Sequence, residues 1–130
     1  MRKIAATYIF PGNGKPLKYG ILVCENDGTV VETIDSLGRL NEQAGLEFYN
    51  GILVPGFVNF DEMLILQQKF PELTLDELIK WACFNGAQAL KTGDCAGSFE
   101  KGKKPGVNLI SGIDFKNMKL TGNSRVKQLF

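Results

Sequence analysis

The segment Phe48-Tyr49-Asn50-Gly51-Ile52-Leu53-Val54-Pro55-Gly56-Phe57-Val58-Asn59 decides the fold of this chain, because the character of the sequence changes there. Two short extended runs, Leu46–Tyr49 and Gly51–Val54, are typical of strands, and Pro55-Gly56 ends them. After Asn59 the sequence favours helices. The segment therefore marks the boundary between a β-rich first part and a helical middle part.

The first part predicts three further strands. Apolar residues from Ile4 to Phe10 recur at the strand period of two, which predicts a half-buried strand with Ile4, Ala6, Tyr8 and Phe10 on one face. The runs 20–25 and 29–34 flank Asn26-Asp27-Gly28, and Asp-Gly between two β-rich runs indicates a hairpin. The polar stretch from 36 to 45 is interpreted as a surface loop.

The middle part predicts two helices. The first covers 61–69 and is closed by Pro71. The second begins after Thr74, which stands three residues before Glu77 and so forms a capping box, with Leu73 and Leu78 placed as the hydrophobic staple. Its apolar residues recur at steps of three and four as far as Leu90, which predicts a helix over 75–90.

After this helix the chain turns extended again. The runs 97–100, 107–110, 118–121 and 126–130 are predicted strands or extended segments, and a lysine-rich turn covers 101–106. The expected fold is α+β and mainly β: one domain, 1–130, built as a small β-sandwich from both chain ends, with the helical segment 61–90 inserted between them. The predicted core is Ile4, Tyr8, Ile21, Val23, Val30, Leu53, Leu78, Leu109 and Val126.

Composition excludes several classes of protein. The chain has 130 residues and a formal charge of +1, so no strong field attracts nucleic acid or anionic lipid. Three cysteines without a CxxC suit a reduced chain better than a disulfide framework or structural zinc. Neither a signal peptide nor an apolar run of about 20 residues is found. We therefore expect a soluble, cytoplasmic protein with no nucleic-acid or membrane partner.

Two blocks of the sequence resemble the amidohydrolase superfamily of metal-dependent hydrolases, of the cytosine-deaminase and chlorohydrolase type. The first sixty residues, ending in the quoted segment, are similar to the leading part of the composite β-domain beside the catalytic barrel. The stretches 73–82 and 85–90 resemble the barrel-terminal helix, and 96–110 is similar to the return into the β-domain. The resemblance implies a metal-assisted attack of water on a C–N bond for an intact relative.

The chain departs from that family where the chemistry would lie. The family's first barrel strand carries a His-x-His pair, but here Asn59 is followed by Phe60, Asp61 and Glu62, and the chain contains no histidine. A (β/α)8 barrel also needs about 250 residues. We therefore assign no catalytic residue, no metal ligand and no cofactor to this chain; a divalent metal is implied only for a full-length relative. The junction resembles a splice, from a natural deletion or an engineered truncation.

Each remaining candidate site has a simpler explanation. Asp61 and Glu62 could bind a cation, but acidic residues in a first helical turn stabilise the helix dipole. The three lysines 101, 103 and 104 fit a solvated turn better than an anion patch. Cys83 lies on an apolar helix without a neighbouring base. The run 12–14 lacks the following helix of a phosphate cradle. Trp81 and Phe84 are interpreted as core or as surface that faced a barrel.

The leading hypothesis is a barrel-less β-domain of an amidohydrolase-like protein, without hydrolase activity of its own. The alternative is a protein-interaction module that uses the helical face. A third hypothesis, an enzyme using thiols and carboxylates, lacks any visible nucleophile–base pair. If a barrel is missing, apolar side chains of 61–90 are left uncovered, which predicts a homodimer through these helices. The residues expected at this exposed face are Met63, Leu64, Leu66, Leu75 and Trp81. The competing arrangement folds both helices back over the sheet.

Overall fold

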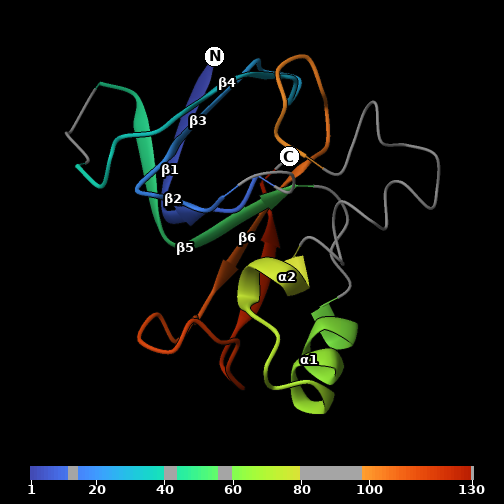
Figure 1. Cartoon of the computed structure of the whole chain (residues 1–130). Helices are drawn as coiled ribbons and strands as arrows, with labels where there is room; N and C mark the ends of the chain where they lie inside the picture. The colour runs from blue at the N-terminus through green and yellow to red at the C-terminus, as the bar shows by residue number, and fades with distance from the viewer. Residues whose placement is uncertain (12–14, 40–43, 56–59, 80–97, 130) are drawn as a thin grey trace.

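The computed structural model describes residues 1–11, 15–39, 44–55, 60–79 and 98–129. In this part of the chain, one mixed sheet of seven strands lies beside two short helices (Figure 1). The elements are β1 (Arg2–Ile9), β2 (Leu17–Lys18), β3 (Ile21–Cys24), β4 (Val30–Ile34), β5 (Leu46–Pro55), α1 (Phe60–Lys69), α2 (Leu75–Ile79), β6 (Val107–Ser111) and β7 (Arg125–Gln128). A small, mainly-β α+β fold is thereby confirmed.

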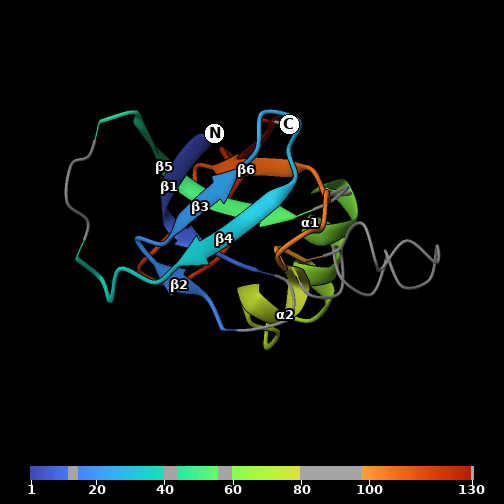
Figure 2. The same ribbon diagram turned by 90° about the horizontal axis from the view of Figure 1, so that it is seen from above.

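The sheet combines strands from both ends of the chain. Its order is β4-β3-β1-β5-β6-β7, and β2 also pairs with β1. β1 and β5 run parallel, whereas β5 pairs antiparallel with β6. This β5–β6 pairing confirms the prediction that the two ends of the chain share one sheet. In Figure 2 residues 35–39, which follow β4, extend toward the side of the molecule away from α1.

β5 is one strand of ten residues where the sequence predicts two short runs. Its pairing with β1 is irregular: from Tyr49 to Ile52, β5 contains one more residue than β1 does between Ala6 and Tyr8. Such an extra residue is a β-bulge, which lets a strand continue through a local bend. The predicted break at Asn50 is therefore a bulge within a continuous strand.

The predicted hairpin between β3 and β4 is confirmed. Glu25 N donates to Thr29 O at 2.8 Å, and Gly28 N donates to Glu25 O at 3.0 Å. Gly28 adopts a φ of 93°, and Asp27 Oδ1 accepts a hydrogen bond from Thr29 N at 2.9 Å. Both residues of the Asp-Gly pair therefore stabilise the turn: glycine adopts the left-handed conformation, and the aspartate side chain accepts a hydrogen bond from a backbone N–H group.

Two predicted strands are wrong. Within 97–100, the described residues Ser98 to Glu100 form a loop, which is fastened to the sheet by Phe99 N donating to Pro11 O and Val30 N donating to Lys103 O. The run 118–121 is not a strand either: Met118 lies in the turn that follows Asp114, and Lys119 forms an isolated β-bridge with Asp114. The short strand β2 was not predicted, and β7 ends before the predicted limit.

The core consists of two main clusters. One lies within the curled sheet and includes Ile4, Leu22, Val30, Leu53 and Leu109; the other lies between the sheet and the helices. Seven of the nine predicted core residues are buried. The two exceptions are Tyr8, which is half-buried, and Val126, which is 36% exposed because β7 is an edge strand with no buried residue.

The prediction that Ile4, Ala6, Tyr8 and Phe10 share one face is also wrong in part. Ile4 and Ala6 lie in the cluster within the sheet, whereas Tyr8 and Phe10 pack in the cluster beneath the helices. The pairing register of β1 with β5 shifts between Ala6 and Tyr8. Ile9, which follows Tyr8, packs with Ile4 and Ala6 in the cluster within the sheet, so the alternation of faces along β1 changes at this irregularity.

Candidate functional site

The described residues contain no group of three or more His, Cys, Asp or Glu side chains that could hold a metal ion. The arrangement that carries the most information about function is instead the junction where the chain leaves the sheet and returns to it. Pro55, the last residue of β5, lies opposite Val107, the first residue of β6, in the antiparallel ladder. The intervening segment thus begins and ends at neighbouring positions of the sheet.

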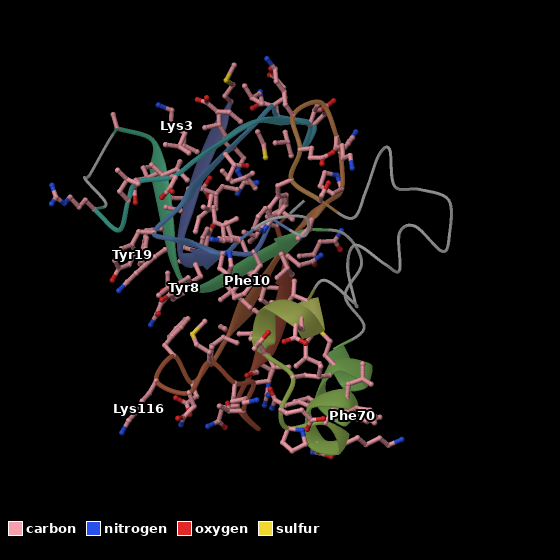
Figure 3. All side chains as sticks on the ribbon, in the orientation of Figure 1. Lys3, Tyr8, Phe10, Tyr19, Phe70 and Lys116 are labelled. Carbon is pink, nitrogen blue, oxygen red and sulfur yellow. The ribbon has the colours of Figure 1, made fainter. Side chains whose placement is uncertain are left out.

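The helices of this intervening segment pack against the sheet through a shared apolar cluster, which we name the junction cluster. Its buried members are Phe10, Ile52, Val54, Met63, Leu75, Leu78, Ile79, Ile110 and Leu120. The sheet supplies Phe10, Ile52, Val54 and Ile110, and Figure 3 shows Phe10 between the sheet and α2. Burial of this apolar surface is the main force that holds the helices in place.

Polar contacts fix the position of the helices more specifically. The side chain of Gln67 in α1 makes two hydrogen bonds to the backbone of Leu120, in the loop between β6 and β7. Lys119 Nζ donates to Pro71 O at 2.7 Å and to Leu73 O at 3.1 Å. These carbonyls lie in the turn between α1 and α2, so one loop of the sheet fastens both the helix and its following turn.

The start of α2 confirms Thr74 as the N-cap, which is one half of the predicted capping box. Thr74 Oγ1 accepts a hydrogen bond from Glu77 N at 3.1 Å, and its hydroxyl lies 3.1 Å from Glu77 Oε1. Leu73 and Leu78 both pack in the junction cluster, as the staple predicts. The helix is described as far as Ile79, and the predicted continuation to Leu90 lies outside the described residues.

The residues expected at an exposed helical face are partly buried instead. Met63 is 1% and Leu75 is 2% exposed, and Leu64 and Leu66 are half-buried against the junction cluster. The expectation of an uncovered face made by Met63 and Leu75 is therefore wrong, because these side chains cover the sheet of their own chain. Trp81 lies outside the described residues.

A polar cluster of Arg2, Glu47 and Tyr49 lies near the chain ends. Arg2 Nε and Nη2 both donate to the Glu47 carboxylate at 2.9 Å, and the Tyr49 hydroxyl donates to Glu47 Oε1 at 3.0 Å. The hydrogen bond from Arg2 lowers the pKa of Glu47, and the hydrogen bond to Glu47 raises the pKa of Tyr49. Arg2 Nη1 also donates to Leu129 O at 3.3 Å. The cluster joins the two ends of the chain.

Cys24 is the thiol that the described residues contain, and it is buried. Burial raises the pKa of this thiol to about 11. Because the thiolate is the nucleophile, a cysteine held protonated at neutral pH is a poor catalyst. The other two cysteines, including Cys83, lie outside the described residues.

The lysine-rich turn does not gather its three charges in one place. Lys103 is half-buried and its Nζ donates to Ser98 Oγ at 2.9 Å while pairing with Glu100 at 3.0 Å. Lys104 lies 3.9 Å from Asp27, and Lys101 is exposed. The Lys103 side chain therefore stabilises the loop 98–106 through its contacts with Ser98 and Glu100.

Other sequence candidates fall at the limits of what the structure describes. Asp61 and Glu62 lie in the first turn of α1, where acidic residues complement the helix dipole. The structure describes the backbone of these two residues but not their side chains. Phe84 and the run 12–14 lie outside the described residues. Gln67 and Lys119 were missed by the sequence reasoning, since neither belongs to a local motif and their partners lie about fifty positions away.

Comparison with known proteins does not assign the chain to a family. No family model matches the chain, and no curated protein matches it. Among solved structures, the chain is similar to the ochratoxinase of A. niger, with a TM-score of 0.33 and 22% sequence identity. That similarity covers 42% of this chain and 13% of the ochratoxinase chain. No helix in the described ranges has the length and apolar character needed to cross a membrane.

Proposed function

We propose that this chain is the β-domain of an amidohydrolase-like protein from which the catalytic barrel is missing, and that it has no hydrolase activity by itself. The observation that carries the proposal is the position of Pro55 opposite Val107. A segment of any size can connect two such neighbouring strand ends without disturbing the sheet. The sequence resemblance to the entry and exit segments of the family supports this, because both coincide with this junction.

The role that follows is structural. For an intact relative, the resemblance implies a divalent metal that activates water for attack on a C–N bond. Histidines would hold that metal, and this chain has none. We further propose that residues 1–130 form one cytoplasmic domain, with 61–90 in the place of the barrel. We also propose that its sheet curls into a small β-sandwich, which the packing of Val30 of β4 and Leu109 of β6 in one cluster supports.

A turnover assay tests the absence of activity. The purified chain is supplied with Zn²⁺ or Mn²⁺ and offered cyclic amides and aminated heterocycles. We expect no hydrolysis above a metal-only control. Metal-dependent turnover that is removed by a chelator and returns with fresh metal would overturn the proposal.

A deletion variant tests whether the sheet is independent of the inserted segment. Residues 56–97 are replaced by a short glycine–serine linker, which retains the loop that bonds Phe99 to Pro11. We expect a cooperatively unfolding β-protein that binds a hydrophobic dye, because the sheet side of the junction cluster loses its cover. A variant without cooperative unfolding would show that the helices belong to the fold and are not an insertion.

The alternative function, an interaction module that uses the helical face, is favoured by one observation. Ile65 and Phe70, at and after α1, are 50% and 46% exposed. Because Met63 and Leu75 are buried, we propose that the predicted homodimer forms through these two exposed side chains. Sedimentation over a wide concentration range tests it: a dimer that Ile65→Lys dissociates supports this function, and a monomer at every concentration contradicts it.

A further inference from the structure

One side of the sheet carries a pair of aromatic rings, of which Phe48 is exposed and Tyr19 is half-buried. Phe48 of β5 is 48% exposed, and its ring centroid lies 6.3 Å from that of Tyr19, with the planes inclined at 47°. Lys18 Nζ lies 5.7 Å from the centroid of the Tyr19 ring. Figure 3 shows Tyr19 on the opposite side of the molecule from Phe70. The junction cluster therefore does not explain this pair.

The backbone at Tyr19 is held in an unfavourable conformation. Its φ is 54°, in the left-handed region where glycine or asparagine is preferred and a bulky side chain is uncommon. Two hydrogen bonds hold it: Tyr19 N donates to Thr7 O at 2.9 Å, and Ser36 Oγ donates to Tyr19 O at 2.8 Å. Backbone strain of this kind is often retained where the side chain has a function.

A polar pair lies beside the rings on the same face. The Thr7 hydroxyl donates to Asn50 Oδ1 at 3.2 Å, and both side chains are accessible. Asn50 belongs to the interval in which β5 has its extra residue, and bulges commonly redirect side chains at binding sites. With Oδ1 bound to Thr7, the Asn50 amide presents Nδ2 as a donor, and the Thr7 oxygen presents its lone pairs as acceptors.

We propose that this surface, formed by Thr7, Tyr19, Phe48 and Asn50, binds a saccharide. A pyranose ring has an apolar C–H face and an edge of hydroxyls that both donate and accept hydrogen bonds. The first matches the accessible ring of Phe48, and the second matches the adjacent amide and hydroxyl. The four side chains are themselves uncharged, and the Lys18 ammonium beside the Tyr19 ring adds a further hydrogen-bond donor for a sugar hydroxyl. The inference is independent of the proposed loss of a barrel.

The test is an NMR titration of the full ¹⁵N-labelled chain with cellohexaose, xylohexaose and mannohexaose. We expect at least one to shift the Asn50 side-chain amide and the backbone amides of Thr7, Tyr19 and Phe48, saturating with a Kd of about 1 mM. Phe48→Ala should weaken binding about tenfold or more. The matched control is Phe70→Ala, which removes an equally exposed ring elsewhere and should leave binding unchanged.

A second variant separates loss of binding from loss of folding. Asn50→Asp keeps the size of the side chain and removes its donor, so it should weaken binding while the remaining amide spectrum is unchanged. The proposal is overturned if none of the three saccharides shifts these resonances, if the shifts lie elsewhere, or if Phe48→Ala and Phe70→Ala weaken binding equally.

Discussion

The side-chain amide of Gln67 and the backbone of Leu120 form a reciprocal pair of hydrogen bonds: Gln67 Nε2 donates to Leu120 O, and Leu120 N donates to Gln67 Oε1, each at 3.0 Å. Leu120 is buried, so its backbone groups have little access to water. A side chain that satisfies a buried donor and a buried acceptor together contributes more than an exposed contact does. Gln67 therefore holds α1 in one position on the loop between β6 and β7.

Gln67→Ala should lower the free energy of unfolding by about 1–3 kcal/mol, because it leaves both backbone groups of Leu120 without their partner. Chemical denaturation measures the change. Gln68→Ala, at the exposed neighbouring position of the same helix, is the control and should change stability by less than about 0.5 kcal/mol. Equal effects of the two substitutions would contradict the assigned role of Gln67.

Gly51→Ala should destabilise the sheet at the bulge. A Cβ atom at Gly51 would lie 2.5 Å from Ile110 O, a backbone atom that cannot move without shifting β6. We expect a loss of about 1–3 kcal/mol in thermal or chemical unfolding. Gly122→Ala provides the comparison, since a Cβ there meets no atom within 4 Å. If Gly51→Ala unfolds like the unsubstituted protein, β5 and β6 do not approach as closely as described.

Leu78→Ala should cost about 2–5 kcal/mol, because Leu78 is fully buried in the junction cluster and the smaller side chain leaves a cavity. Its counterpart is Leu37→Ala, at a position that is 82% exposed. That substitution should change stability by less than about 0.5 kcal/mol. Denaturant unfolding of both variants, analysed with a common slope, separates the two outcomes.

The stability of the protein should fall in acid through Glu47. Arg2 lowers the pKa of Glu47 below its usual 4.5, so the folded state favours the carboxylate. The resulting stabilisation is complete above pH 4.5 and is lost as the pH falls through the folded-state pKa. In Glu47→Gln this contribution is absent. The difference in stability between the two proteins should therefore be constant near neutral pH and shrink below pH 4.5, and a difference that grows in acid would contradict the pairing.

That comparison is not disturbed by the other acidic groups whose pKa is lowered. A hydrogen bond from the backbone of Thr29 lowers the pKa of Asp27, and hydrogen bonds from the side chain and then the backbone of Asn117 lower the pKa of Asp114. Both residues are present in the two proteins, so their contribution cancels in the difference.

Cys24 should resist thiol reagents in the folded protein, since it is buried and its pKa is raised to about 11. The measurement uses a variant with Cys83→Ser and Cys95→Ser, so that Cys24 alone can react. We expect labelling only when denaturant is added. Rapid labelling in buffer at neutral pH would show that the region between β1, β3 and the C-terminal segment opens readily.

Local motifs of the sequence predict much of this fold. The hairpin around Asp27-Gly28 and the N-cap bond from Glu77 N to Thr74 depend on contacts within a few residues, and the structure contains both. The bulge at Asn50 could not be predicted in the same way, because it depends on how β5 pairs with β1. The turn around Asp114 is local, since its carboxylate accepts hydrogen bonds from Lys116 N and Asn117 N, and the prediction of a strand over 118–121 overlooked it.

The candidate site was harder to predict than the fold. The sequence identifies the junction as a break after Pro55, but the partner of Pro55 is a residue far along the chain. Likewise, Met63 and Leu75 have the apolar character of an interface, and only the packing shows that the interface lies within one chain. An apolar helical face predicts that something covers it and does not identify what does.

The neighbouring strand ends at Pro55 and Val107 also have a consequence for evolution. Closing a flexible loop between two fixed points costs entropy that grows only with the logarithm of its length, about 0.6 kcal/mol for each doubling. The closure entropy therefore changes little when a gene segment enters or leaves this position, and the larger change comes from whatever covers the sheet side of the junction cluster. Selection can act on the inserted part while the strands around it continue to fold, so this junction is a point at which proteins of very different size can share one β-domain.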